Sequence, residues 1–332
     1  MNYNEVAYKA LSHWNLQPAR VTLIAERENR VFKVVDFKGK TYALRIHRLH
    51  YQSEAAILSE LAWMKSLKIS KILVPEPIAA KNGKFLINEC GFQIDLLSWL
   101  NGKQIGVTGG SLDLSNRLET FFDLGRLLAT LHNHSDSWEL PPDFVRPKWD
   151  KDGILGPKPV WGKFWENPSL NIREKNLFEA GRNKALTILK SKDFDFGLIH
   201  ADMVRENILI DGSSLAIIDF DDCGFGYRLF DLATALIKNR SELDYQDLQA
   251  AILNGYKTLR IIDEERLDLF LLLRAFTYVG WIVPRIKELE AEIRQTRFIK
   301  NYMGYKAEPG KEKEQTIQNV TYTFFQINQK NT

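Results

Sequence analysis

The residue types best suited to chemistry in this chain are gathered in one short stretch. They are His200, Asp202, Asn207 and Asp219. Between Asn207 and Asp219, two short apolar runs flank a polar turn, a pattern that predicts a β-hairpin. Antiparallel pairing then sets Asn207 opposite Ile218 or Asp219 at the open end. An amide oxygen and a carboxylate there, beside the carboxylate of Asp202, are oxygen ligands that suit Mg²⁺ shared with phosphate.

This arrangement resembles the protein-kinase superfamily. It is closer to the aminoglycoside-phosphotransferase-like branch, which includes homoserine, choline and stress-response kinases. The catalytic loop of protein kinases has the pattern H-R-D-x-x-x-x-N, and the metal-binding Asp follows in D-F-G. Here Ala201 stands in place of the Arg, and the second motif is Asp-Phe-Asp at 219–221. Both departures are typical of the small-molecule branch.

The resemblance implies a role for each of these residues. Asp202 is the implied catalytic base, which accepts the proton of the acceptor hydroxyl. Asn207 and Asp219 are the implied metal ligands, and Asp231, in Phe-Asp-Leu-Ala, is the implied buried residue that fixes the catalytic loop. His200 is expected to pack and to hydrogen-bond locally, and not to do acid–base chemistry.

Two further carboxylates, Asp221 and Asp222, lie beside the predicted metal loop. Either could assist the metal, but two adjacent side chains rarely point at one place, so at most one is expected to do so. Taken singly, an H-x-D sequence and an Asp-Gly turn are ordinary features of proteins. The fixed spacing, the hairpin and the Asp-Phe-Asp motif together favour a kinase-like phosphotransferase site.

Arg45 ends a Tyr-Ala-Leu-Arg strand that resembles the Val-Ala-Ile-Lys strand of kinases. The resemblance puts Arg45 where a lysine contacts the α- and β-phosphates of ATP, with a planar fork in place of a compact ammonium. An exposed strand arginine is the alternative. A helix predicted over Ser53–Leu67 turns Glu60 into its apolar face. A carboxylate buried there needs a partner, and Arg45 is the expected one. Glu54 also falls toward this face and is the alternative to Glu60 as the partner of Arg45.

The rest of the nucleotide site has weaker signals. A Gly-rich phosphate loop is absent from residues 26–32, where Asn29 could donate to phosphate or could simply belong to a solvated turn. The segment Phe92–Leu97, followed by Ser98–Gly102, resembles the hinge of the family, whose backbone hydrogen-bonds adenine. Leu97 and Trp99 are its nominal hinge residues, although Trp99 would serve equally well in packing.

Half of the eight tryptophans fall between the predicted core helix and the catalytic loop. This stretch is aromatic and basic, and its residues are Trp138, Phe144, Arg146, Lys148, Trp149, Trp161 and Trp165. Long irregular segments are usually functional or disordered, and so many tryptophans argue against disorder. The rings could line an acceptor site through stacking and cation–π contacts, or they could fasten the insert to its lobe.

Length and composition set the broad class. With 332 residues the chain exceeds the usual size of one hydrophobic core, so two lobes are expected. The net charge of +3 is too small to indicate nucleic-acid binding, and no run of about eighteen apolar residues predicts a transmembrane helix. The N-terminus lacks a signal-peptide pattern, and two distant cysteines suit a reducing compartment. We expect a cytoplasmic protein that binds neither nucleic acid nor membrane, and we leave its oligomeric state open.

The expected fold class is α+β. The resemblance implies a bilobal protein-kinase-like fold with a small antiparallel-sheet N-lobe and a mainly helical C-lobe. Residues 1–97 are the expected nucleotide-binding lobe, 98–103 the hinge, and 104–332 the helical lobe with the catalytic loop and acceptor site. The predicted strands are Val21–Ala25, Arg30–Phe37, Thr41–Ile46, Pro77–Ala80 and Phe85–Asn88. The predicted helices, besides Ser53–Leu67, are Leu118–His134, Arg173–Lys190, Arg228–Asn239, Tyr245–Leu259 and Glu264–Leu289.

These features predict an ATP- and Mg²⁺-dependent phosphotransferase that moves the γ-phosphoryl group to a hydroxyl of a small molecule, such as an amino alcohol or a homoserine-like compound. The first alternative is a serine/threonine protein kinase of the stress-response type. The short span from Asp219 to Asp231, with no Ala-Pro-Glu after it, favours the small acceptor. A non-catalytic nucleotide-binding scaffold is the second alternative. It stays open because Arg45 stands where kinases have a lysine.

Overall fold

A computed structural model describes residues 2–26, 29–288 and 291–302, and its chain divides into two compact units. The first unit comprises Met1–Ser115, Asn133–Arg146 and Arg205–Cys223, and the second comprises Asn116–His132, Pro147–Val204 and Gly224–Thr332. The predicted hinge, residues 98–103, falls inside the first unit, so the boundaries at 97 and 104 stay predictions. Residues 303–332 of the predicted second lobe lie outside the described residues.

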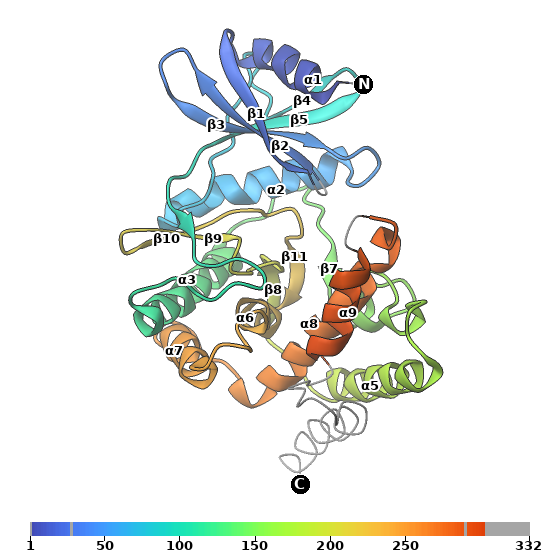
Figure 1. Cartoon of the computed structure of the whole chain (residues 1–332). Helices are drawn as coiled ribbons and strands as arrows, with labels where there is room; N and C mark the ends of the chain where they lie inside the picture. The colour runs from blue at the N-terminus through green and yellow to red at the C-terminus, as the bar shows by residue number, and fades with distance from the viewer. Residues whose placement is uncertain (1, 27–28, 289–290, 303–332) are drawn as a thin grey trace. The chain divides into compact units, whose positions relative to one another are not determined.

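The first unit is built on a five-stranded antiparallel sheet, shown in blue and cyan in Figure 1. Its strands are β1 (Ala19–Glu26), β2 (Asn29–Asp36), β3 (Thr41–His47), β4 (Leu86–Glu89) and β5 (Phe92–Ser98). Their order is β1-β2-β3-β5-β4, and each neighbouring pair is antiparallel. The first three predicted strands are therefore confirmed, with small differences at their ends.

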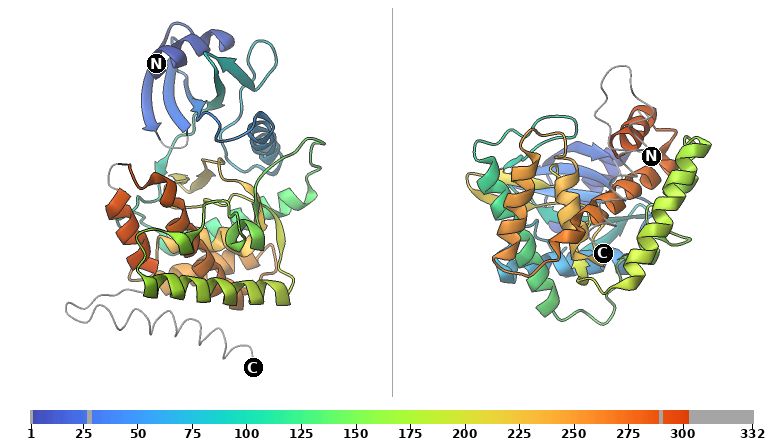
Figure 2. Two further views of the ribbon diagram at one scale, coloured as in Figure 1. Left: turned by 90° about the vertical axis from the view of Figure 1, so that its right-hand side faces the viewer. Right: turned by 90° about the horizontal axis from the view of Figure 1, so that it is seen from below.

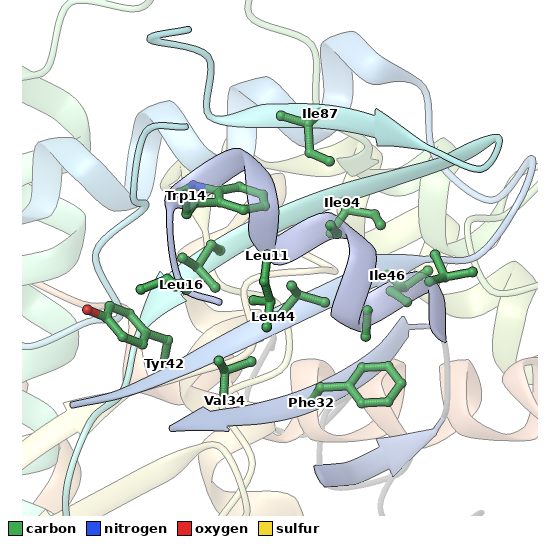
Figure 3. Close-up of a cluster of buried hydrophobic side chains, with 14 of the residues drawn as sticks. Leu11, Trp14, Leu16, Phe32, Val34, Tyr42, Leu44, Ile46, Ile87 and Ile94 are labelled. Atoms are coloured by element: carbon green, nitrogen blue, oxygen red, sulfur yellow. The ribbon is translucent and has the colours of Figure 1, made fainter. Parts of the chain in front are cut away.

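One face of this sheet carries an apolar core, in which the side chains of Leu44 and Ile46 are fully buried (Figure 3). Helix α1 (Tyr3–Ala10) contributes Val6, Ala7 and Ala10 to the same core. This short helix was not among the predicted elements, and Asn2 caps it by accepting a hydrogen bond from the backbone of Asn4. Because side chains alternate along a strand, β3 turns Arg45 and His47 to the opposite face.

Helix α2 (Glu54–Leu67) confirms the prediction for this segment. The Ser53 hydroxyl caps its N-terminus by accepting from the backbone N–H of Ala56. Its buried residues include Ile57, Leu61 and Met64, as the apolar periodicity predicted, and Glu60 is buried among them. A short 3₁₀ helix, Lys68–Ser70, follows.

The predicted strand Pro77–Ala80 is wrong. Pro77 makes a single bridge to Leu97. The predicted strand Phe85–Asn88 is confirmed with its ends moved by one residue, as β4 (Leu86–Glu89), but its partner is β5. Proline has no N–H to donate, and Pro77 begins the segment with Pro75 two residues before it, so a regular ladder does not form. The segment is fixed instead by single bonds, such as that from the Ile78 N–H to the Leu96 carbonyl at 2.8 Å.

The second unit is mainly helical, and Figure 2 shows its helices in two further views. They are α3 (Arg117–Ser137, of which the residues from Asn133 belong to the first unit), α4 (Lys151–Leu155), α5 (Ile172–Ser191), α6 (Arg228–Ile237), α7 (Tyr245–Lys257), α8 (Leu267–Trp281) and α9 (Ala291–Tyr302). Helices α6 and α8 pack against each other, and α9 packs on α8. Four predicted helices are confirmed, with small differences at their ends.

The predicted helix Glu264–Leu289 is wrong in its length. The structure has a 3₁₀ turn at Glu264–Arg266, then α8, then a second 3₁₀ turn at Val283–Arg285. Pro284 explains the break, because it cannot donate the next helical hydrogen bond. Glu264–Arg285 is long and apolar enough to cross a membrane by length and composition, but 72% of its apolar window is buried inside the protein. That burial is typical of the core helix of a soluble protein.

Two small sheets complete the architecture. In the first unit, β6 (Lys103–Gln104), β9 (Ile208–Asp211) and β10 (Ser214–Ile217) form a sheet in the order β10-β9-β6. In the second unit, β7 (Lys148–Trp149), β8 (Phe196–Ile199) and β11 (Gly224–Tyr227) form another, in the order β7-β11-β8. Another 3₁₀ helix, Phe164–Glu166, lies in the aromatic insert.

Candidate active site

The β9–β10 hairpin carries the two predicted metal ligands at its open end, one beyond the end of each strand. Ile208 pairs with Ile217, and the Ile218 N–H donates to the Asn207 carbonyl at 2.9 Å, so Asn207 lies opposite Ile218, one of the two pairings that the sequence left open. Asp219 follows directly, with a φ of +67°, in the left-handed region that few non-glycine residues occupy. Such strained positions cluster at functional sites.

The donor set at this end of the hairpin suits magnesium. Asn207 supplies an amide oxygen and Asp219, which is exposed, supplies a carboxylate. Within the described residues, no three His, Cys, Asp or Glu side chains gather as a metal cluster. One carboxylate and one amide could hold a Mg²⁺ ion that takes its remaining ligands from water and substrate phosphates.

Arg45 is held on the face of the sheet opposite the apolar core, by two buried carboxylates. Its Nη1 donates to Glu60 Oε1 at 2.7 Å, which confirms the predicted Arg45–Glu60 contact. Its other edge forms a fork with Asp95, from Nε to Oδ1 at 2.9 Å and from Nη2 to Oδ2 at 2.8 Å. His47 Nε2 lies 2.7 Å from the same Oδ2. Arg45 is 5% exposed, so the alternative of an exposed strand arginine is wrong.

Electrostatics within this cluster favour the charged forms of both Arg45 and Asp95. Burial alone would raise the pKa of Asp95, but the charges of Arg45 and His47 outweigh it and lower the pKa to about 2. Burial would likewise lower the pKa of Arg45, yet Asp95 and Glu60 together raise it well above its usual value. Asp95 pairs across strands with Arg45, and the sequence analysis missed it.

Arg45→Lys is expected to lower the free energy of unfolding by about 1–3 kcal/mol. A lysine ammonium keeps the charge, but it cannot form the fork with Asp95 while it also bonds Glu60, so a buried acceptor loses its donor. Urea unfolding measures the loss. Arg20→Lys, at an exposed position in β1, is the matched control and should change stability by less than about 0.5 kcal/mol. Equal stability of Arg45→Lys and the native chain would contradict this account.

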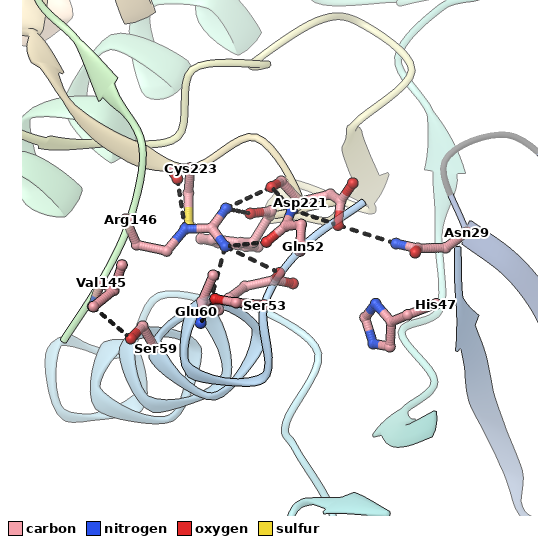
Figure 4. A network of polar contacts seen from close by, with 12 residues as sticks. Asn29, His47, Gln52, Ser53, Ser59, Glu60, Val145, Arg146, Asp221 and Cys223 are labelled. Atoms are coloured by element: carbon pink, nitrogen blue, oxygen red, sulfur yellow. Dashed lines mark hydrogen bonds and ion pairs between the residues drawn. The ribbon is translucent and has the colours of Figure 1, made fainter. Parts of the chain in front are cut away.

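Arg146 fixes the backbone of the Asp-Phe-Asp loop (Figure 4). Its guanidinium donates to the Cys223 carbonyl at 2.7 Å and to the carbonyls of Phe220 and Asp221. On its other side it donates to Gln52 Oε1 at 2.7 Å and to the Ala56 carbonyl at 3.1 Å. Its Nη1 also lies 3.8 Å from Glu60 Oε2. Arg146 therefore ties the loop that carries Asp219 to the start of α2 and to the carboxylate that holds Arg45.

Asn29 and Asp221 are engaged with each other. Asn29 Nδ2 donates to Asp221 Oδ1 at 3.1 Å, and Gln52 Nε2 lies 3.2 Å from the same oxygen (Figure 4). Burial raises the pKa of Asp221, and the nearby Glu60 raises it further. The predicted turn residue Asn29 is thus 9% exposed and part of β2. Its role toward phosphate stays a prediction.

The nominal hinge residues differ in their surroundings. Leu97 is 4% exposed near the end of β5, where it bridges to Pro77. Trp99 is half-buried, and the Lys33 Nζ lies 4.8 Å from its ring centroid. Neither contact tests adenine binding, so both assignments stay predictions.

In the second unit, the catalytic loop is fixed by Asp231. Both oxygens of this buried carboxylate accept backbone bonds, from the His200 N–H at 2.9 Å and the Ala201 N–H at 2.6 Å. Ala201 has a φ of +64°, again in the left-handed region. His200 accepts from the Asp202 N–H at its Nδ1 at 3.3 Å. These are the local contacts predicted for His200 and Asp231, and they hold the backbone that carries Asp202.

His132 is a second buried support of this loop. Its Nε2 lies 3.1 Å from Asp231 Oδ2, and its Nδ1 lies 2.8 Å from the Tyr256 hydroxyl. Burial lowers the pKa of His132 to about 4, although the bond to Asp231 opposes the shift. The neutral ring satisfies both contacts, since Nε2 donates to the carboxylate and Nδ1 accepts from the hydroxyl.

Stability should fall as the pH is lowered through the slightly acid range. The pKa of His132 is about 4 in the fold and about 6.5 when unfolded. The unfolded chain therefore binds the proton first, and the contribution of neutral His132, full above about pH 6.5, is lost as the pH falls toward 4. The expected loss is roughly 3 kcal/mol in urea unfolding. His132→Asn should flatten this dependence, whereas the exposed His50→Asn should not. An unchanged slope in His132→Asn would contradict the assignment.

The tryptophans of the insert serve mainly in packing. Trp149, Trp161 and Trp165 are 0%, 9% and 7% exposed. Trp149 stacks on Phe230 at 5.6 Å and meets Trp161 edge-on at 5.3 Å. Of the two readings left open by the sequence, the buried rings support the one in which they fasten the insert.

Most of the chain matches a known protein family. Residues 20–270 match the family model described as the phosphotransferase enzyme family, APH. The chain belongs to this family. Among its relatives in the family, amicoumacin kinase of Bacillus subtilis (strain 168) is 25% identical over 240 residues, which are 70% of this chain and 67% of that protein. Homoserine kinase of Methylobacterium radiotolerans is 25% identical over 207 residues, 60% of this chain and 59% of that one, so the match spans less than two thirds of that relative.

Solved structures of kinases share the fold of this family member. A microcompartment-associated aminopropanol kinase superposes with a TM-score of 0.77 and 28% identity, covering 90% of this chain and 95% of that one. The amicoumacin kinase hAmiN, in complex with AMP-PNP, Ca²⁺ and Ami, has a TM-score of 0.73 and 21% identity, over 91% and 93% of the two chains. The predicted α+β, protein-kinase-like fold class is confirmed.

Proposed function

We propose that this family member transfers the γ-phosphoryl group of ATP, with Mg²⁺, to a hydroxyl of a small amino alcohol or homoserine-like molecule. The observation that carries the proposal is the β9–β10 hairpin, in which Asn207 lies opposite Ile218 at the open end and Asp219 is the next residue along the chain. A phosphotransferase needs oxygen ligands for a metal at the phosphates, and this end of the hairpin supplies two of them.

Each candidate residue receives one proposed role in this reaction. Asp202 orients the acceptor hydroxyl and takes its proton. Asn207 and Asp219 hold the magnesium, which when bound neutralises charge that develops on the phosphoryl group. Arg45 contacts the nucleotide phosphates, and Glu60 keeps its guanidinium in place. Since phosphoryl transfer needs little covalent help, most of the acceleration would come from position and electrostatics.

The remaining nucleotide contacts and the loop supports complete the assignment. We assign Asn29 to the phosphates and the backbone of Leu97 and Trp99 to adenine. His200 and Asp231 support the loop through the bonds described above. We also propose that the chain works in the cytoplasm, since Cys90 and Cys223 are both free thiols.

The acceptor class rests on the relatives. The printed names of three of them, amicoumacin kinase, homoserine kinase and aminopropanol kinase, all denote small-molecule substrates. Homoserine and aminopropanol both combine an amine with a hydroxyl, which is why we propose an acceptor that carries both groups. A protein kinase of the stress-response type remains the second candidate, because it would share the same catalytic motifs. A scaffold without catalysis is the third.

An ATP-consumption assay with Mg²⁺ separates the candidates. The acceptors to compare are 1-amino-2-propanol, ethanolamine, homoserine, an aminoglycoside and denatured casein. Turnover with an amino alcohol or homoserine, above the rate without acceptor, is the expected result. Phosphate found only on serine or threonine of casein would favour the protein kinase. Nucleotide binding without turnover on any acceptor would favour the scaffold and overturn the proposal.

A further inference from the structure

Asp202 has a buried cationic partner that the roles above do not use. Arg274 of α8 donates from Nη2 to Asp202 Oδ1 at 2.5 Å. The Arg274 side chain is fully buried, whereas that of Asp202 is 22% exposed. Seventy-two residues separate the two in the chain, so the contact depends on tertiary packing in the second unit.

Three aromatic rings surround the guanidinium of Arg274. Its Cζ lies 4.4 Å from the ring centroid of Trp161, 4.4 Å from that of Tyr278 and 5.4 Å from that of Phe230. The Tyr278 hydroxyl also accepts from Nη2 at 3.2 Å. Cation–π contacts are strongest where the cation is desolvated, so these three rings restrict the position of the buried guanidinium. We use "Arg274 cage" for these three rings.

The Arg274 cage is itself part of the packed core. Trp161 comes close to α8 because Gly280 has no side chain: a Cβ at Gly280 would lie 2.5 Å from the Gly162 carbonyl oxygen and 2.8 Å from that of Trp161. Tyr278 lies one turn after Arg274 on α8, so both project from the same side of the helix. The rings therefore cannot move aside without disturbing the helix packing.

We propose that Arg274 is a positioning residue for Asp202, an inference that rests on the proposed function. A carboxylate has two oxygens, and a free one would rotate between several orientations. The bond from Arg274 to Oδ1 fixes the plane of the group, and with it the direction from which the carboxylate can receive the proton of the acceptor hydroxyl. Catalytic groups work best when their rotamers are locked by such supporting contacts. Arg274 thus acts through Asp202 and does not itself take part in the transfer.

A purely structural role is the competing explanation, and it makes a different prediction. If Arg274 only fills the core, its replacement should lower the free energy of unfolding without a specific change in kcat at a temperature where the variant is folded. If it positions Asp202, kcat should fall while the affinity for nucleotide and the KM for the acceptor stay close to those of the native chain. The split between kcat and binding therefore separates the two.

The test compares Arg274→Met and Arg274→Lys with the native chain in steady-state kinetics on the best acceptor. Arg274→Met should lower kcat by about 10²-fold, as expected for a misplaced catalytic group, and Arg274→Lys should recover part of the loss because it keeps the charge. Arg182→Met is the matched control: Arg182 stacks on Trp165 at 4.2 Å in the same unit but bonds the Leu155 carbonyl. Its kcat should not change.

Tyr278→Phe keeps the proposal testable if Arg274→Met fails to fold. This variant removes one acceptor of Arg274 and leaves the ring, so it should fold and should show a smaller fall in kcat with unchanged nucleotide affinity. If the native chain is active and both Arg274→Lys and Tyr278→Phe have the native kcat, this inference is overturned while the proposed function stands. A native chain that transfers no phosphoryl group to any acceptor would instead overturn the proposed function.

Discussion

Asp202→Asn should lower kcat roughly 10²–10⁴-fold, the range contributed by a positioned general base. Asparagine has nearly the shape of aspartate, and its amide oxygen can still accept from Arg274, but it cannot take a proton from the acceptor hydroxyl. The bonds of the loop to Asp231 come from backbone N–H groups and should survive the change. Nucleotide affinity, measured by calorimetry, should therefore match that of the native chain.

Asp211→Asn is the matched control for this substitution. Asp211 is exposed at the turn end of the same hairpin whose open end carries Asp219, and it takes no part in the proposed reaction. Its kcat should equal that of the native chain. An Asp202→Asn variant with native kcat would show that the hydroxyl proton leaves by another route, and Asp202 would then lose its assigned role.

Arg146→Met should lower the free energy of unfolding by about 3–5 kcal/mol, the cost of breaking a buried charged pair from one side. The substitution removes the donors of three carbonyl groups in residues 220–223 and leaves the buried Glu60 with Arg45 as its remaining close cation. Residues 220–223 directly follow Asp219, the proposed Mg²⁺ ligand. The apparent affinity for Mg²⁺ in the kinase assay should therefore fall as well.

Lys148→Met controls for the loss of a positive charge in the same part of the chain. Lys148 is exposed two residues after Arg146, so its replacement should change stability by less than about 0.5 kcal/mol. The free energy of unfolding of Arg146→Lys should lie between those of Arg146→Met and Lys148→Met, because one ammonium cannot bond both the loop and α2. Equal stability of Arg146→Met and Lys148→Met would contradict the role of Arg146 in fixing the loop.

Features with a short-range cause could be predicted from the sequence. Periodicity along α2 put Glu60 on a buried face, and the need for a partner then pointed to Arg45, which is what the structure has. The two apolar runs after Asn207 similarly predicted the hairpin and left Ile218 or Asp219 as the residue opposite Asn207, and the structure has Ile218 there. Both inferences use only the geometry of one helix or one hairpin.

Features that depend on long-range pairing were missed. Asp95 meets Arg45 only because β5 pairs with β3, fifty residues apart in the chain. Arg274 meets Asp202 only through the packing of α8. The local signal that could have marked both residues is a single charged residue within an apolar strand or helix, since such a charge needs a partner when it is buried. Asp95 stands between Ile94 and Leu96, and Arg274 follows a run of leucines.

The central claim is that one phosphate monoester forms on a small molecule for each ATP consumed, and ³¹P NMR of the complete reaction tests it most directly. With Mg²⁺, ATP and an amino alcohol, the account predicts a new monoester resonance that grows in step with ADP, and both signals should grow roughly 10²–10⁴-fold more slowly in the Asp202→Asn reaction. If ADP accumulates with inorganic phosphate alone, or if no acceptor yields an ester, the account is contradicted.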